Sequence, residues 1–148
     1  MDDIDRDILN TIQSGFPVKP RPFMEIGKSL DLTEKEVIAR IKRLKTDGII
    51  RRIGGNFVSK KLGFTSTLCA AKVPENKIEE FVKKVNSYKG VTHNYLRSHD
   101  YNIWFTFIAP SMDDINLSLQ EISATTNVRE ILNLPAVNIF KIKVDFTV

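Results

Sequence analysis

The chain has 148 residues, 42% of them hydrophobic and 27% charged, a composition that excludes a disordered chain, a collagen-like repeat and a disulfide-stapled miniprotein. Its formal net charge is +4, and seven basic residues within residues 35–52 predict an anionic partner, either nucleic acid or a small molecule rich in carboxylates or phosphates. Because no apolar run is long enough to span a membrane and the acidic N-terminus differs from a signal peptide, we expect a soluble, cytoplasmic protein.

The first 60 residues predict three helices. Asp3 is placed to cap the first helix, whose isoleucines recur at helical spacing. Three prolines at alternate positions stiffen the following loop, and Pro22 is placed to open the second helix. Thr33 begins the third helix with a capping box that Glu36 completes.

A β-ribbon is expected after the third helix. Residues 49–53 and 56–59 have the pattern of two strands around a turn at Gly54 and Gly55. Three helices followed by such a ribbon predict a winged helix-turn-helix domain over residues 1–60.

The pattern of residues 61–148 predicts a ferredoxin-like domain. Strands are expected at residues 65–73, 91–97, 103–108 and 140–146, and helices around residues 78–85 and 115–122. The resulting order is β-α-β-β-α-β, so the whole chain is predicted to be an α+β protein. We expect Cys69, in the first of these strands, to be a buried thiol of the core.

One predicted strand carries side chains suited to chemistry. Because side chains alternate along a strand, His93, Tyr95 and Arg97 should share one face of the sheet. They offer a proton donor near neutral pH, a phenol and a fixed cation, beside a hairpin that contains Tyr101 and Trp104. This set predicts the wall of a pocket for a flat, anionic ligand.

The alternative interpretation of this strand is an exposed sheet face on which Arg97 pairs with Asp100. His99 is expected to be a turn residue. The chain has two histidines and one cysteine, without a metal-binding spacing, so we do not expect a metal site built from the protein alone. It also contains neither a phosphate-binding glycine loop nor a Ser or Cys nucleophile with convincing partners.

Several segments resemble known families. Residues 4–9 and 37–50 resemble the helix-turn-helix of the Lrp/AsnC regulators, and the second half resembles their ligand-binding domain. A closer resemblance, to the siroheme decarboxylases of alternative haem and haem d1 synthesis, lies in residues 16–23 (FPVKPRPF), 50–55 (IRRIGG), 63–70 (GFTSTLCA), 90–97 (GVTHNYLR) and 101–106 (YNIWFT).

The resemblance implies a reaction and a mode of assembly. It implies removal of CO₂ from the C12 and C18 acetate side chains of siroheme, which gives 12,18-didecarboxysiroheme. No added cofactor is expected, because the iron enters with the substrate. The resemblance also implies a dimer with a homologous subunit or with a second copy. The tetrapyrrole would be held against the ferredoxin-like domain, where His93 and Arg97 belong to the active site.

Siroheme carries eight carboxylates, so its binding requires several fixed cations. The expected substrate-binding residues are Arg51, Arg52, Asn94, Tyr101, Trp104 and Arg21. The expected catalytic residues are His93, Tyr95 and Arg97. We expect His93 to supply a proton with the assistance of Tyr95, and its alternative roles are an axial ligand of the siroheme iron or a hydrogen bond to a carboxylate.

Two other functions fit much of the same sequence. The helix-turn-helix and its basic third helix are typical of a DNA-binding transcription regulator. Glu34 and Glu36, however, occupy the start of that helix, which enters the major groove in such proteins, and carboxylates there oppose binding to phosphates. DNA is therefore not the expected partner. A tetrapyrrole-sensing protein that binds without reacting would need the same pocket.

Overall fold

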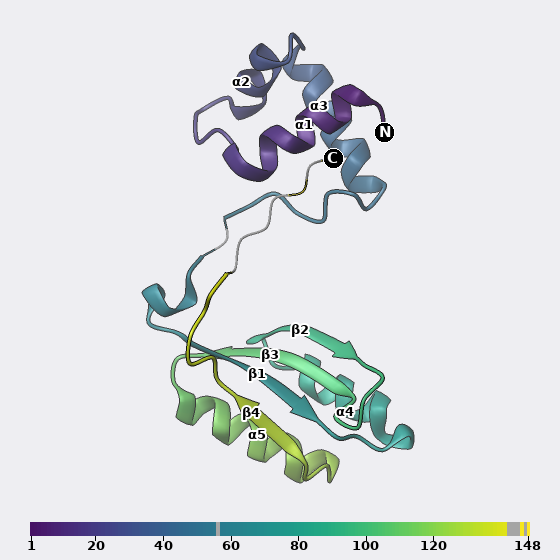
Figure 1. Ribbon diagram of the computed structural model, residues 1–148, viewed down its shortest axis with the longest axis vertical. Coiled ribbons are helices and arrows are strands. Elements are labelled where there is room, and N and C mark those ends of the chain that lie inside the picture. The colour runs from purple at the N-terminus through teal and green to yellow at the C-terminus, as the bar shows by residue number, and fades with distance from the viewer. Residues whose placement is uncertain (56, 142–145, 147) are drawn as a thin grey trace. The chain divides into compact units, whose positions relative to one another are not determined.

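The structure, a computed structural model, describes residues 1–55, 57–141, 146 and 148. By its internal contacts the chain forms two compact units (Figure 1). The helical unit consists of Met1–Gly55 with Lys141–Val148, and the sheet unit consists of Asn56–Phe140. The boundary expected from the sequence lay after residue 60, with residues 141–148 assigned to the second domain.

The helical unit contains the expected helix-turn-helix. Its helices are α1 (Asp3–Gly15), α2 (Pro22–Ser29) and α3 (Glu34–Thr46). The helices pack around a buried apolar core made by Ile8, Ile26, Val37, Ile41, Leu44 and Ile50. No helix of the described residues is both long and apolar enough to cross a membrane.

The ends of the helices follow the sequence signals with one correction. Pro22 opens α2, and Thr33 caps α3 in a capping box with Glu36, as predicted. The cap of α1 is Asp2 and not Asp3. The Asp2 carboxylate accepts the N–H of Asp5 at 2.8 Å, and the Asp5 carboxylate accepts the N–H of Asp2 at 3.0 Å. This reciprocal pair needs a carboxylate three residues after the cap, a condition that Asp2 meets.

The predicted β-ribbon after α3 is not formed. Residues 49–55 and 57–59 contain no strand, and Asn56 lies outside the described residues. The N–H groups of Ile49 and Ile50 both donate to the carbonyl of Leu44 at 3.0 Å. They therefore cap the end of α3 and do not pair with a second strand. A short 3₁₀ helix, η1 (Ser59–Leu62), follows.

The sheet unit has the predicted ferredoxin-like order. Its strands are β1 (Thr65–Ala71), β2 (Val91–Leu96), β3 (Ile103–Ala109) and β4 (Ile131–Leu134), and its helices are η2 (Glu75–Lys77), α4 (Ile78–Asn86) and α5 (Met112–Thr126). The strands pair antiparallel in the order β2-β3-β1-β4. Both α-helices pack on one face of the sheet (Figure 1). Cys69 is fully buried in this core, as expected, and burial raises the pKa of its thiol to about 12.

The last strand of the described sheet is Ile131–Leu134, whereas the sequence predicted a last strand at residues 140–146. Phe140, Lys141 and Phe146 are outside any strand, and residues 142–145 lie outside the described residues. Ile131–Leu134 occupies the edge beside β1, with Leu134 opposite Leu68. That edge is therefore already filled before the chain reaches residue 140.

Candidate functional site

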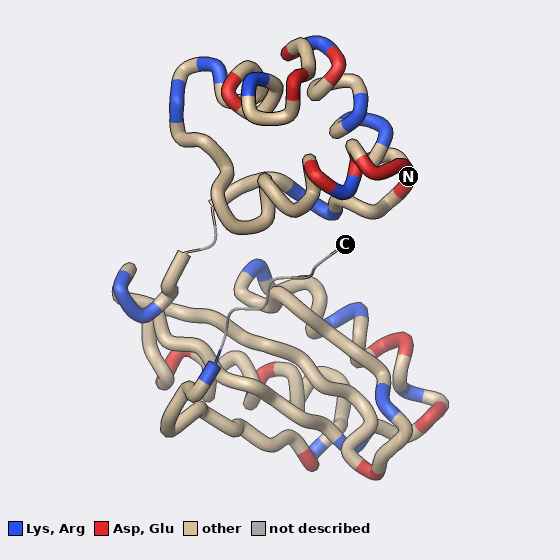
Figure 2. The backbone as a smooth tube through the Cα atoms, turned by 45° about the horizontal axis from the view of Figure 1, so that its top comes forward, with Lys and Arg blue, Asp and Glu red and all other residues tan. Residues whose placement is uncertain are grey.

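The face of the sheet that the helices do not cover is open and rich in apolar and aromatic side chains. Two cross-strand rows face it, Leu134–Leu68–Thr106–His93 and Leu132–Ala70–Trp104–Tyr95. The four strands of the described sheet contain no Lys, Arg, Asp or Glu (Figure 2). A cation, Arg97, follows directly at the end of β2. The face thus combines a large apolar surface with a fixed positive charge at one edge.

A one-residue bulge in β2 turns His93 onto this open face. Val91 lies opposite Phe107 and packs against the core, whereas His93 lies opposite Thr106. Thr92 is therefore an extra residue that has no counterpart in β3. Without the bulge Val91 and His93 would point to the same face, because strand residues two apart share one face. The bulge allows a single strand to bury Val91 and to expose His93.

Gly90 permits the close approach of β2 to β3 beside the bulge. Its carbonyl accepts the N–H of Ile108 at 2.9 Å. A Cβ atom on residue 90 would lie 2.0 Å from the carbonyl oxygen of Ile108. This backbone path therefore requires a residue without a side chain.

The structure brings His93, Tyr95 and Arg97 together beside Trp104. The imidazole and phenol rings stack, with centroids 6.0 Å apart and planes inclined by 24°. The guanidinium carbon of Arg97 lies 6.0 Å from the Tyr95 centroid and 5.6 Å from the Trp104 centroid. Trp104 Nε1 in turn donates to the carbonyl of Tyr101 at 2.6 Å. Aromatic faces attract a guanidinium, so the rings hold Arg97 at the edge of the open face. We call these four side chains, His93, Tyr95, Trp104 and Arg97, the aromatic row.

The turn after β2 has a structural role. His99 Nδ1 accepts the N–H of Tyr101 at 3.1 Å, in agreement with the turn role expected for this histidine. The N–H of Arg97 donates to the carbonyl of Asn102 at 2.7 Å. No ion pair joins Arg97 to Asp100 within the part of the chain that the structure describes. The Arg97 side chain is therefore available to a ligand.

Asn94 and Arg21, which are also expected binding residues, have partners outside the aromatic row. Asn94 lies opposite Phe105 on the helix-covered face, and its Nδ2 donates to Asn86 Oδ1 at 2.9 Å. Its position follows from the alternation that turns its neighbours in β2 the other way. Arg21 belongs to the helical unit and pairs with Glu34, which raises the pKa of the guanidinium.

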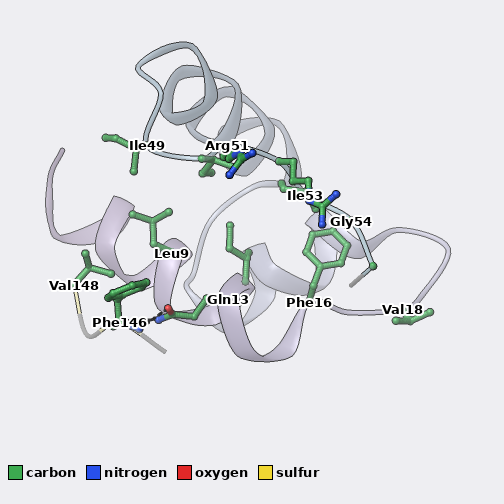
Figure 3. Close-up of a pocket in the computed structure, with 14 residues that line it drawn as sticks. Leu9, Gln13, Phe16, Val18, Ile49, Arg51, Ile53, Gly54, Phe146 and Val148 are labelled. Carbon is green, nitrogen blue, oxygen red and sulfur yellow. Dashed lines mark hydrogen bonds between the residues drawn. The ribbon is translucent and has the colours of Figure 1, made fainter. Parts of the chain in front are cut away.

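Arg51 and Arg52 line a cavity of about 870 Å³ within the helical unit (Figure 3). The other lining residues are mainly apolar: Leu9, Ile12, Gln13, Phe16, Val18, Ile49, Ile50, Ile53, Gly54, Gly55, Phe146 and Val148. The Gln13 side chain fixes Phe146 by donating to its carbonyl at 2.5 Å and accepting its N–H at 2.9 Å. This cavity could not be predicted from the sequence, because its walls come from both ends of the chain.

Two basic side chains of α3 are bound inside the helical unit. Arg40 Nη1 donates to Asp2 and Asp5 at 2.8 Å, and Arg43 also pairs with Asp5. Asp5 is fully buried. Burial alone would raise the pKa of Asp5, but the N–H of Asp2 and the two guanidinium groups together lower it. These two arginines therefore join α1 to α3 and are not free for a DNA backbone.

His93 gives the aromatic row an imidazole, which is the commonest metal ligand among protein side chains. No group of three or more His, Cys, Asp and Glu suited to a metal ion occurs among the described residues.

Two family models match the chain. Residues 5–51 match the siroheme decarboxylase NirDL-like HTH domain, and residues 61–141 match the AsnC-like ligand binding domain. The chain is 58% identical to the siroheme decarboxylase alpha subunit of Desulfovibrio desulfuricans over 146 residues, which are 99% of this chain and 84% of that subunit.

Solved structures show the same two relationships. The siroheme decarboxylase NirDL matches with a TM-score of 0.72 at 33% identity, over 96% of this chain and 46% of that chain. The chain thus spans a little under half of the solved NirDL chain. The structure of NirDL in co-complex with an iron-uroporphyrin III analogue matches with a TM-score of 0.70 at 31% identity, over 96% of this chain and 48% of that one. Escherichia coli AsnC matches with a TM-score of 0.80 at 18% identity, over 98% and 97% of the two chains, which shows the shared fold.

Proposed function

The chain belongs to the siroheme decarboxylase family, and we propose that it is a subunit of an enzyme that removes CO₂ from siroheme. The observation that carries this proposal is the aromatic row on the open sheet face. A flat aromatic surface with a guanidinium at its edge suits a flat macrocycle that bears carboxylates. The co-complex of NirDL with an iron-uroporphyrin III analogue supports the same class of ligand.

The proposed reaction is that of a carboxy-lyase acting on a carbon–carbon bond. The acetates at C12 and C18 lose their carboxyl groups, and the product is 12,18-didecarboxysiroheme. In each step the bond between the acetate CH₂ and its carboxylate breaks, and the electron pair stays on the CH₂ carbon. CO₂ leaves and one proton completes a methyl group. Because no electrons are gained or lost overall, the reaction requires no redox cofactor, and the siroheme iron enters with the substrate.

The aromatic row supplies the functions that this reaction needs. Arg97 binds a carboxylate of the substrate through two parallel N–H groups of its planar guanidinium. The apolar face around it removes water from the departing carboxylate, which is less stable as an ion there. His93, stacked on Tyr95, donates the proton to carbon. Arg51 and Arg52 are proposed as additional carboxylate ligands.

We propose a homologous subunit as the partner of this chain, with a second copy of the chain as the alternative. The relative from Desulfovibrio desulfuricans is named as an alpha subunit. The solved NirDL chain is about twice as long as the part that this chain matches. Both observations favour a working unit that contains two chains of this kind.

Product analysis tests the proposed function. Siroheme is incubated anaerobically with the full chain, alone and together with a homologous subunit, and the tetrapyrroles are analysed by mass spectrometry. We expect the loss of two CO₂ units. Recovery of bound but unchanged siroheme under both conditions would identify a tetrapyrrole sensor. Tight, sequence-selective binding in a salt-dependent gel-shift titration would identify a DNA-binding regulator.

A further inference from the structure

The bulge that exposes His93 also places Thr92 beside it. Thr92 Oγ1 lies 3.1 Å from His93 Nδ1. Neighbouring residues of a regular strand point to opposite faces, so two adjacent side chains meet here only because the extra residue interrupts the alternation. Both side chains are exposed, and Thr92 makes no other side-chain hydrogen bond within the described part of the chain.

A hydroxyl is suited to keep Nδ1 occupied in both charge states of the imidazole. It can donate to Nδ1 of a neutral ring whose proton is on Nε2, and it can accept from the Nδ1 proton when the ring is charged. The partner of one ring nitrogen determines what the other nitrogen can do. Tyr95 restrains the same ring from its face, with the two planes inclined by 24°. The imidazole of His93 is therefore held by one contact in its plane and one contact on its face.

We propose that Thr92 is a positioning residue that binds Nδ1 and thereby makes Nε2 the nitrogen of His93 that meets the substrate. This inference rests on the proposed function only where it names siroheme as that substrate. The hydrogen bond and the selected nitrogen are properties of the free protein. Nε2 then donates the proton if His93 is the acid, and it binds the metal if His93 is the axial ligand of the siroheme iron.

Nitrogen-15 NMR of the histidine-labelled full chain tests the proposal without substrate. For the neutral ring of His93 we expect the proton on Nε2 and a hydrogen-bonded, unprotonated Nδ1. Thr92→Val removes the hydroxyl and keeps the branched shape that suits a strand, and it should move the Nδ1 resonance to that of a free ring nitrogen. Thr92→Ser should retain the wild-type resonance. A proton on Nδ1, or an Nδ1 resonance that is unchanged in Thr92→Val, overturns the proposal.

His99 is the internal control for this measurement, because it is the other histidine of the chain. Its Nδ1 accepts a backbone N–H from Tyr101 at 3.1 Å. The nitrogen resonances of His99 should therefore be the same in the wild type and in both Thr92 variants. A simultaneous change at His99 would indicate a general rearrangement of the hairpin and would contradict a local role of Thr92.

Steady-state kinetics then test the consequence for the reaction. We expect Thr92→Val to lower kcat about 10-fold with KM within twofold, and Thr92→Ser to restore kcat. An unchanged kcat in Thr92→Val would overturn the positioning role. The two levels of inference fail separately. If the expected NMR result is found but siroheme is not decarboxylated, the proposed function fails and the assignment of Nε2 stands. If siroheme is decarboxylated but Nδ1 is free, only the role of Thr92 fails.

Discussion

His93 is the residue of the aromatic row that we propose as the donor of the proton. Replacement by Ala removes that proton but leaves Arg97 and both aromatic rings in place. We expect His93→Ala to lower kcat by about 10²–10⁴-fold, while the affinity for siroheme changes only a few-fold. Single-turnover product formation and spectroscopic titration measure the two effects.

An unchanged rate in His93→Ala would rule out the acid role, and a shift of the Soret band of bound siroheme would identify His93 as an iron ligand. His99→Ala, in the adjacent turn, is the control and should retain the wild-type kcat.

Arg97 depends on two aromatic rings for its place on the open face. Its guanidinium carbon lies 5.6 Å from the centroid of Trp104 and 6.0 Å from that of Tyr95. Arg97→Lys keeps the charge but loses the planar group that stacks on rings and binds a carboxylate through two N–H groups. We expect siroheme to bind about 10-fold more weakly, a change of about 1.4 kcal/mol, with kcat nearly unchanged.

Quenching of Trp104, the single tryptophan of the chain, measures this affinity directly. Arg129→Lys is a matched control, because Arg129 is exposed and follows α5 in the same unit. If Arg97→Lys binds siroheme as tightly as Arg129→Lys does, Arg97 does not bind a carboxylate in the proposed way.

Among the elements, the bulge in β2 depends on Gly90. A Cβ atom there would lie 2.0 Å from the carbonyl oxygen of Ile108, so Gly90→Ala must displace backbone. We expect the free energy of unfolding to fall by about 1–3 kcal/mol, and the nitrogen resonances of His93 to shift. Gly15→Ala is the control, because a Cβ at Gly15 meets nothing within 4 Å. Denaturant unfolding followed by circular dichroism compares the two variants, and equal stabilities would show that the bulge does not need glycine.

The contact between α1 and α3 depends on the buried carboxylate of Asp5. Asp5→Ala leaves Arg40 and Arg43 without this partner in a partly buried position. We expect a loss of about 2–3 kcal/mol in the free energy of unfolding of the helical unit. Asp7→Ala, at an exposed position of α1, should change it by less than about 0.5 kcal/mol. The same denaturation experiment measures both, and a wild-type midpoint for Asp5→Ala would contradict a structural role of the ion pairs.

Elements with a long apolar period could be predicted from the sequence, whereas those decided by competition between segments could not. The helices and the order of the sheet follow from periodic apolar residues and from caps such as Thr33. The prediction of a ribbon was wrong because the N–H groups of Ile49 and Ile50 donate to a carbonyl at the end of α3. The last strand was missed because it has only four residues, just before Pro135, while residues 140–146 alternate more regularly.

The candidate site could likewise be predicted from the sequence only in part. His93, Tyr95 and Arg97 could be placed on one face because the alternation is regular after the bulge. The bulge itself was missed, although the sequence carries a signal for it. Val91 and His93 have the same phase in the strand but opposite preferences for burial, and a regular strand cannot satisfy both. The cavity beside Arg51 had no local signal, since its walls are distant in sequence.

At the scale of the whole molecule, the carboxylates with lowered pKa values are concentrated in the helical unit. Arg40 holds the pKa of Asp2 at about 2, and Lys19 and Lys28 hold the pKa of Glu25 at about 2. In the sheet unit, Lys84 lowers the pKa of the exposed Glu121. Unfolding returns these carboxylates to their ordinary values of 3.8 for Asp and 4.5 for Glu. The unfolded state therefore binds protons first as the pH falls.

The stabilisation from these pairs is therefore complete above about pH 5 and is lost as the pH falls towards 2. Because the helical unit holds more of them, we expect acid to unfold it before the sheet unit. In a titration of the full chain, the part of the helical circular dichroism that comes from α1, α2 and α3 should be lost at a higher pH. The part that comes from α4 and α5 should be lost together with the fluorescence of Trp104, which reports on the sheet unit. Glu25→Gln removes one titrating pair and should make the first transition less steep. A single midpoint for both signals would show that the two units unfold together. That result would contradict the prediction, which requires that the ion pairs of the helical unit determine its own stability in acid.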